Sequence, residues 1–219
     1  MMRAVSSKIL AAVKQSKEKM HPSKFKQSLE LIINVTGVDL SKPQNRFTEV
    51  VELPNDLGRK RRKILVIASG NLALEASRTE GVSRVLTREE LETLVGRKRE
   101  AKKIAKAFDF VLVEPSLMGL AARALGAALG GRGKTPIPIP PGSDLQKLVK
   151  RYANSVQVQL RKTPVIACLV GLEEDSDEKI AENAETVLNR VVEKLEKRQR
   201  NISSVYLKAT RGTPVKVEF

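Results

Sequence analysis

The sequence predicts two domains of the α/β and α+β classes: a discontinuous α+β domain with an antiparallel sheet built from both termini, and an inserted Rossmann-like α/β/α domain. Strand-like segments near both ends alternate apolar and polar residues, which is typical of an antiparallel sheet with one open face. The middle of the chain instead carries continuous apolar runs that alternate with helical segments, which favours a parallel sheet covered on both faces. We therefore expect one domain from residues 1–62 plus 157–219, and the insertion at 63–156.

The N-terminal segment is expected to form one helix and two strands. Apolar residues recur at helical spacing among lysines in residues 5–20, and Pro22 ends this helix. Residues 28–36, "SLELIINVT", are apolar at every second position, which predicts a half-exposed strand. A second strand, "FTEVVELP", is closed by Pro54.

The insertion is expected to begin with the apolar run "KILVIASG", followed by a helix. The short strand "VSRVLT" comes next, and Thr87 with Glu90 forms a capping box that opens another helix. A basic helix, the strand "DFVLVEP" and a helix capped by Ser116 complete the alternation. The Pro-rich connector "TPIPIPPGS" then ends it, and Asp144 caps one more helix.

The C-terminal part returns to the first domain. Strands are expected at "VQVQL" and "PVIACLVG", followed by a long amphipathic helix within residues 176–198. Two last strands, "ISSVYLKAT" and "PVKVEF", flank the residues Arg211, Gly212 and Thr213. Four carboxylates, Glu173, Glu174, Asp175 and Asp177, lie at the start of the long helix, where the helix dipole explains them better than acid–base catalysis does.

The charge of the chain points to a polyanionic partner. Forty Lys and Arg residues against 25 Asp and Glu residues give a formal net charge of +15, which makes nucleic acid the leading partner class. Aromatic residues make up only 3% and Trp is absent, which disfavours binding by stacking bases on aromatic platforms. We expect contacts to the backbone and shape of the nucleic acid instead.

The single cysteine, Cys168, and the single histidine, His21, exclude an intrachain disulfide framework and a His-rich metal cluster. We therefore expect no metal, no cofactor and no catalytic residues. No apolar stretch approaches the length of a membrane span and the N-terminus lacks an apolar signal core, so a cytoplasmic protein is expected.

In the stretch "ALGGRGKTPIP", the last glycine belongs to a Gly-Lys-Thr triplet that resembles the end of a nucleotide-binding loop. A complete phosphate loop needs glycine where Ala128 stands, and a helix that begins at Lys134. Pro136 forbids that helix. A connector remains, in which Arg132 and Lys134 are possible secondary RNA contacts. Ser69-Gly70 likewise starts a dinucleotide motif that the following glycine spacing does not continue.

Two basic runs, "RKRRK" at 59–63 and "RKREAKK" at 97–103, could neutralise phosphates. Taken alone, each could equally be a solvated face or a polar hinge. The net charge favours contacts to nucleic acid.

Two further stretches suit close approach of a nucleic-acid backbone. "KFKQS" supplies a cation, a ring and short hydrogen-bonding groups just before the first strand; the residues concerned are Lys24, Phe25, Gln27 and Ser28. "KATRGTPVKV", from Lys208, joins the last two strands, where Gly212 lacks a Cβ and Thr210 could bond a 2′-hydroxyl. A loop with one packed aromatic and an ordinary hairpin turn are the alternatives.

Four ordered stretches together resemble the ribosomal L-one family, in an archaeal-type form, over essentially the whole chain. They are "KFKQS", "KPQNR", "LGGRGKTPIP" and "KATRGTPVKV". Family members lie in the mobile stalk of the large ribosomal subunit beside the tRNA exit site. The resemblance implies a non-enzymatic ribosomal protein of two domains, in which the first carries most of the binding to ribosomal RNA.

Carried onto this sequence, the resemblance implies RNA contacts from the two stretches side by side. The implied residues are Lys24, Phe25, Gln27, Ser28, Lys208, Thr210, Arg211 and Gly212, with Glu30 a weaker candidate on the polar face of the first strand. It also implies contact with the departing exit-site tRNA and repression of the protein's own mRNA. We expect a monomer away from the ribosome.

The sequence departs from the family at several positions. Arg211 replaces the usual Met, Gly131 and Thr135 replace the usual Pro and Met, and the usual His-Gly after Leu53-Pro54 is missing. Two other classes remain open: an α/β enzyme that binds a phosphorylated small molecule, and a general nucleic-acid-compacting protein.

Overall fold

The computed structural model describes residues 2–58 and 62–218. The chain forms two compact units, Met1–Lys60 with Ser155–Phe219, and Arg61–Asn154. Three residues of the basic run at 59–63, Arg59, Lys60 and Arg61, lie outside the described residues. Whether each unit folds by itself stays a prediction.

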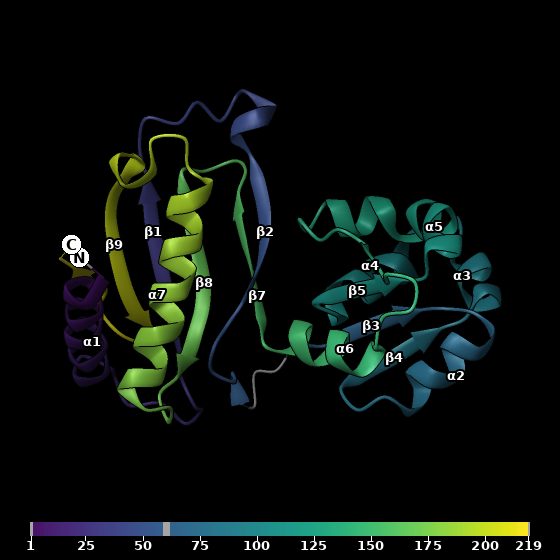
Figure 1. Ribbon diagram of the computed structural model, residues 1–219, viewed down its shortest axis with the longest axis horizontal. Coiled ribbons are helices and arrows are strands. Elements are labelled where there is room, and N and C mark those ends of the chain that lie inside the picture. Colours follow the sequence, from purple (N-terminus) through teal and green to yellow (C-terminus); the bar gives the residue numbers. More distant parts are fainter. Residues whose placement is uncertain (1, 59–61, 219) are drawn as a thin grey trace. The chain divides into compact units, whose positions relative to one another are not determined.

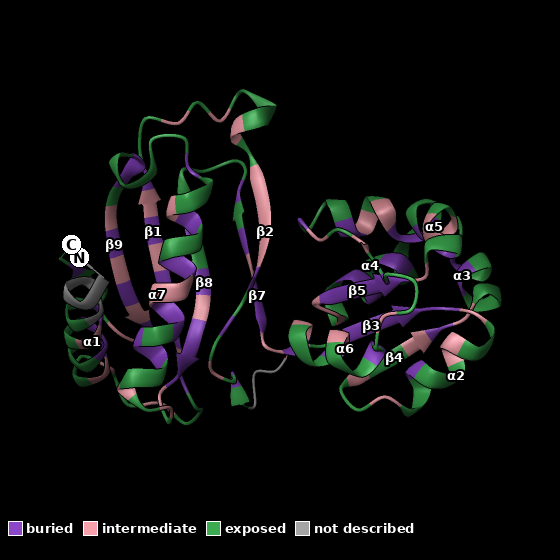
Figure 2. Cartoon of the chain, viewed as in Figure 1, coloured by how far each residue is buried: buried purple, intermediate pink, exposed green. Residues whose placement is uncertain are grey.

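The first unit contains a four-stranded antiparallel sheet in the order β10-β9-β1-β8 (Figure 1). Its strands are β1 (Ser28–Val35), β8 (Val165–Leu172), β9 (Ile202–Ala209) and β10 (Val215–Val217). Alternate residues of β1 are buried, as the sequence pattern predicted, and Figure 2 shows the bands along β1 and β9.

Two helices cover one face of this sheet: α1 (Met2–Glu18) and α7 (Asp177–Lys194). Ile9 and Val13 of α1 share one apolar core with Leu31 of β1 and Ala184 of α7. None of the described helices lies on the opposite face of the sheet (Figure 1). Because β1 buries only every second residue, its other residues point to this open face.

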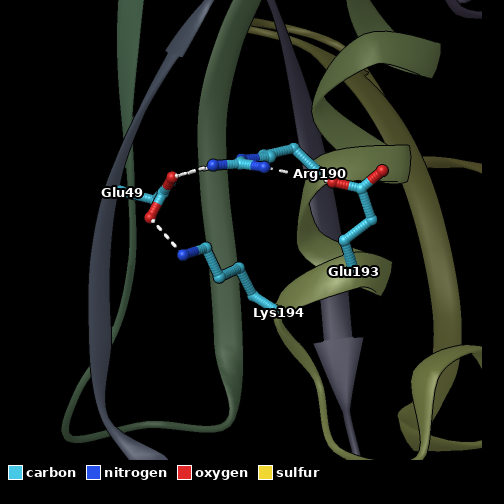
Figure 3. A network of polar contacts seen from close by, with 4 residues as sticks. All are labelled: Glu49, Arg190, Glu193 and Lys194. Atoms are coloured by element: carbon cyan, nitrogen blue, oxygen red, sulfur yellow. Dashed lines mark hydrogen bonds and ion pairs between the residues drawn. The ribbon is translucent and has the colours of Figure 1, made fainter.

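A two-stranded antiparallel ribbon, β2 (Phe47–Glu52) with β7 (Ser155–Leu160), completes the first unit. Glu49 ties it to α7, because its carboxylate pairs with Arg190 at 2.5 Å and with Lys194 at 3.0 Å (Figure 3). Burial alone would raise the pKa of Glu49, but the hydrogen bonds from Arg190 and Lys194 outweigh burial and lower it. Short 3₁₀ helices span Pro43–Asn45 and Arg198–Asn201.

The second unit is a parallel sheet in the order β4-β3-β5-β6. Its strands are β3 (Ile64–Ile67), β4 (Val82–Leu86), β5 (Phe110–Val113) and β6 (Ile137–Pro138). Its helices are α2 (Gly70–Arg78), α3 (Arg88–Leu94), α4 (Lys98–Ala107), α5 (Met118–Gly130) and α6 (Leu145–Ala153), with a 3₁₀ turn at Pro115–Leu117.

Helices lie on both faces of the parallel sheet, as the continuous apolar strands predicted. Val111 and Val113 share an apolar cluster with α3, α4 and α5. Phe110, which points to the opposite face, contacts Tyr152 of α6 with ring centroids 5.3 Å apart. The fold class expected from the sequence, a terminal α+β part interrupted by a Rossmann-like α/β/α part, is therefore confirmed.

The structure corrects two local predictions in this unit. The Pro-rich connector contributes the edge strand β6, in which Ile137 pairs with Leu112 of β5; an edge position tolerates the adjacent proline because one side of the strand needs no donor. Ser116 does not cap α5. It lies in the preceding 3₁₀ turn, and its hydroxyl donates to Glu114 at 2.5 Å. The capping box of Thr87 and the Asp144 cap are confirmed.

Within the described residues, every helix falls short of the length and apolarity that crossing a membrane requires.

Candidate RNA interface

The structure brings two distant stretches together at one end of the first unit's sheet. Residues 20–28 lead into β1, and residues 209–213 turn from β9 towards β10. The His21 amide donates to the Arg211 carbonyl at 2.8 Å, and Met20 forms an antiparallel bridge with Gly212. The Thr210 amide donates to the Ser28 carbonyl at 3.0 Å. The predicted adjacency of these stretches thus arises from backbone pairing between chain segments about 180 residues apart in sequence.

Gln27 holds the two stretches in register. Its side-chain Nε2 donates to the His21 carbonyl at 2.7 Å, and its Oε1 accepts from the Arg211 amide at 2.8 Å. Only 2% of the residue is exposed. Both ends of its amide are therefore used inside the protein, where Gln27 positions the loop, and its expected contact with RNA stays a prediction.

Phe25 has the opposite environment. It is 51% exposed, which is unusual for a large apolar side chain. The Phe25 carbonyl accepts a hydrogen bond from the Ser23 hydroxyl at 2.5 Å, which restrains the backbone at this residue. Lys24 is exposed beside it, and Lys26 lies within 4 Å of the Glu173 and Glu174 carboxylates. The ring is thus available for stacking, with a cation next to it.

Thr210 and Ser28 form a small hydrogen-bonded pair. The Thr210 hydroxyl accepts from the Ser28 amide at 3.1 Å and donates to the Ser28 carbonyl at 3.2 Å. Thr210 is exposed, and a hydroxyl oxygen can accept two hydrogen bonds. One acceptor site therefore remains for a ribose 2′-hydroxyl, while the hydroxyl proton is already used.

Gly212 is constrained by the protein itself. A Cβ at this position would lie 3.3 Å from both the Lys19 carbonyl oxygen and the Ala209 Cβ. These contacts are tighter than ordinary van der Waals contacts, so a larger residue would disturb the pairing of the two stretches. Close approach of RNA is therefore not required to explain this glycine. Arg211, next to it, is exposed and carries its charge to the same end of the sheet.

Charged and aromatic side chains continue along the open face of the sheet. Glu30 of β1 is paired in register with Lys208 of β9, and both point away from the helices. Tyr206 is two residues before Lys208 on the same face, in register with Ile32 and Lys216. Sequence reasoning missed Tyr206, although the period-2 alternation of "ISSVYLKA" places it on the face of Lys208.

The two secondary candidates lie in the second unit and differ from each other. The Lys134 ammonium donates to the Ala105 carbonyl at 3.0 Å and to the Phe108 carbonyl at 2.5 Å, which closes the C-terminal end of α4. Burial lowers the pKa of Lys134. The structure thus gives Lys134 an internal role, and Arg132 is exposed. The expected RNA contacts of both residues stay predictions.

Among the described residues, no group of three or more His, Cys, Asp and Glu side chains is arranged to hold a metal ion. What the first unit does present is an exposed ring, a row of cations and backbone-braced loops. These features belong to a chain of two compact units, in which the second unit is inserted into the sequence of the first.

The chain belongs to the ribosomal protein L1p/L10e family, a family of structural, non-enzymatic ribosomal proteins, whose model matches residues 13–213. This confirms the family resemblance predicted from the four short stretches.

Archaeal proteins named large ribosomal subunit protein uL1 resemble the chain over nearly its full length. That of Methanothermobacter thermautotrophicus is 40% identical over 213 residues, which cover 97% of this chain and 100% of the relative. That of Pyrococcus abyssi is 44% identical over 212 residues, covering 96% of this chain and 95% of the relative. That of Thermofilum pendens is 43% identical over 194 residues, covering 89% and 85%.

Proposed function

We propose that this chain is a structural constituent of the large ribosomal subunit, and that its first unit binds ribosomal RNA of the mobile stalk near the tRNA exit site. Family membership supports the ribosomal role. The observation that carries the RNA site is the half-exposed ring of Phe25, held at the junction of two stretches that Gln27 fixes in register.

Each exposed group of the site has a chemical part in this proposal. The Phe25 ring stacks on an unpaired base or ribose, and Lys24, Lys208 and Arg211 neutralise phosphates. Thr210 accepts a hydrogen bond from a 2′-hydroxyl, a group that DNA lacks.

Glu30 and Ser28 have supporting parts. Because Glu30 is in register with Lys208, its carboxylate can orient the ammonium of Lys208 or accept from a base amino group. Ser28 fixes the Thr210 hydroxyl through its backbone. The braced loops keep these groups in place before RNA arrives, which lowers the entropy lost on binding.

The family also supports two consequences of this binding. A protein on the stalk beside the exit site would assist release of deacylated tRNA. An mRNA segment with the same backbone shape would compete for the site, which would repress translation of the protein's own message. Both follow from one shape-directed interface, because phosphate and 2′-hydroxyl contacts recognise RNA geometry more than sequence.

The enzymatic alternative, a phosphorylated small molecule in the second unit, is disfavoured by two contacts. Ligands of open α/β sheets bind at the point where the strand order reverses, because the connections that follow the two neighbouring parallel strands run to opposite sides. In this sheet that point lies between β3 and β5. The Glu114 carboxylate lies there and accepts from the Ser69 amide and hydroxyl, each at 2.8 Å. The hydrogen bond from Ser116, with those from Ser69, lowers the pKa of Glu114, so the position carries a negative charge. The other location, the glycine loop, has its lysine engaged by carbonyls.

The proposal is tested by measuring binding of the full chain to a stalk RNA fragment and to an unrelated structured RNA of equal length. We expect the stalk fragment to bind at least 10³-fold more tightly at physiological salt, within the range of specific over non-specific nucleic-acid binding. Equal affinity for the two RNAs, or equal affinity for duplex DNA, would replace the proposal by the compacting-protein alternative.

A further inference from the structure

Helix α4 of the second unit presents a row of cations to solvent. Its apolar face, with Ala101, Ile104 and Ala105, is buried against the unit's core. The exposed cations recur four residues apart along the other face: Lys98, Lys102 and Lys106 in one line, and Arg99 and Lys103 in another. We call these five residues the α4 basic face.

The α4 basic face has no ion-pair partners among the described residues. The one carboxylate on the helix, Glu100, pairs with Arg97 at 3.4 Å, and Arg97 precedes the helix. None of the ion pairs found between described residues involves a cation of the α4 basic face. As exposed side chains, these cations are solvated by water and screened by dissolved salt.

Helix stability does not explain this arrangement. Like charges four residues apart repel each other, and the face contains three such pairs. Lys98 and Arg99 lie in the first turn, where the helix dipole disfavours cations. Only Lys106, in the last turn, is placed favourably for the dipole. Helix stability alone would thus favour acidic or neutral residues at positions 98 and 99.

The turn after α5 extends the α4 basic face. The ammonium of Lys134 donates to the Ala105 and Phe108 carbonyls, which holds this turn against the C-terminal end of α4. Arg132, two residues earlier, is exposed. The internal bonds of Lys134 thereby place a further cation beside the helix.

The geometry points to a second nucleic-acid surface: the α4 basic face, with Arg132, binds the sugar–phosphate backbone of double-helical RNA. From Lys98 to Lys106 the helix rises about 12 Å, enough to meet several phosphates. The helix contains no aromatic residue that could stack on a base, and side chains cannot read the deep, narrow major groove of an RNA duplex, so its cations contact the backbone without reading bases. This inference rests on the proposed function in one respect, that the partner is RNA.

The test compares two triple variants of the full chain on an RNA duplex of arbitrary sequence that lacks the stalk site. One variant changes Lys98, Lys102 and Lys106 to Gln. The matched control changes Arg78, Arg123 and Lys150 to Gln, three exposed cations of the same unit that also lie outside the observed ion pairs. Both variants lose three charges. Circular dichroism melting establishes that each remains folded.

We expect the α4 variant to lower the slope of log affinity against log salt by about two to three units, and the control by less than one. Equal slopes for the two variants would overturn the inference, because net charge alone would then explain duplex binding. The result is separable from the proposed function: loss of stalk-fragment binding in a Phe25 variant depends on the first unit, and the α4 variant is expected to keep its preference for the stalk fragment over unrelated RNA.

Discussion

Replacing Phe25 by alanine removes the one large ring that the described part of the first unit exposes by half or more. Stacking of a base on an aromatic side chain contributes about 1–3 kcal/mol by alanine substitution, so we expect Phe25→Ala to weaken binding of the stalk fragment by roughly 5- to 150-fold. Because 51% of the residue is already in water, its removal should change the free energy of unfolding by less than about 0.5 kcal/mol.

Filter binding across a salt series, with urea unfolding of the same samples, measures both quantities. Leu74→Ala is the matched control, because Leu74 is 59% exposed and lies in the second unit. The salt slope should stay unchanged in Phe25→Ala, since no charge is removed. Unchanged affinity would refute the stacking role, and a large loss of stability would show instead that the ring packs against the protein.

Three further substitutions test the roles of other residues. Gln27→Leu leaves the His21 carbonyl and the Arg211 amide without partners, so we expect a loss of about 2–3 kcal/mol in urea unfolding together with weaker RNA binding; a stable variant with normal affinity would contradict the positioning role. Lys134→Met should lower the melting temperature of the second unit without changing the salt slope, and a slope reduced by one unit would restore the phosphate contact. Because the pKa of Glu49 is lowered, the stability that its ion pairs contribute is complete above the ordinary carboxyl pKa and is lost as pH falls through the lowered value. We expect Glu49→Gln to lower the free energy of unfolding by about 1 kcal/mol at neutral pH and to reduce its dependence on acid pH. An unchanged dependence of stability on pH would exclude the network of Figure 3 as its source.

The strands and helices were predictable where local periodicity and burial coincide. Apolar residues alternate with polar ones around Leu31, where one face of the strand is covered, and are continuous around Val66, where both faces are covered. The spacing of apolar residues therefore distinguished the two sheets. The edge strand β6 was missed because the prolines around it indicate a connector. Its two residues count as a strand only because they pair with β5, where Ile137 lies opposite Leu112. Ser116 was misassigned because a serine before a helical segment can either cap the helix or lie in a preceding 3₁₀ turn, and the sequence does not distinguish the two.

The candidate site was predictable in its location and less so in its roles. Phe25 could be identified because an aromatic residue among lysines before a strand is unusual on a solvent-facing loop. Gln27 and Lys134 were assigned to RNA because their polarity suggests exposure, whereas the side chains of both form hydrogen bonds inside the protein. Three of their four partners, Arg211, Ala105 and Phe108, lie 26 to 184 residues away in sequence, and no local pattern records them.

The most direct test of the central claim uses a protein in which residues 1–60 are joined through a short glycine linker to 155–219. The Arg62 amide donates to the Ala153 carbonyl at 3.2 Å, so the chain enters and leaves the second unit at adjacent points and a short linker can replace it. We predict that this protein folds and prefers the stalk fragment over unrelated RNA by the same ratio as the full chain. A folded protein, shown by a dispersed NMR spectrum, that binds both RNAs equally would contradict the assignment of the specific RNA site to the first unit.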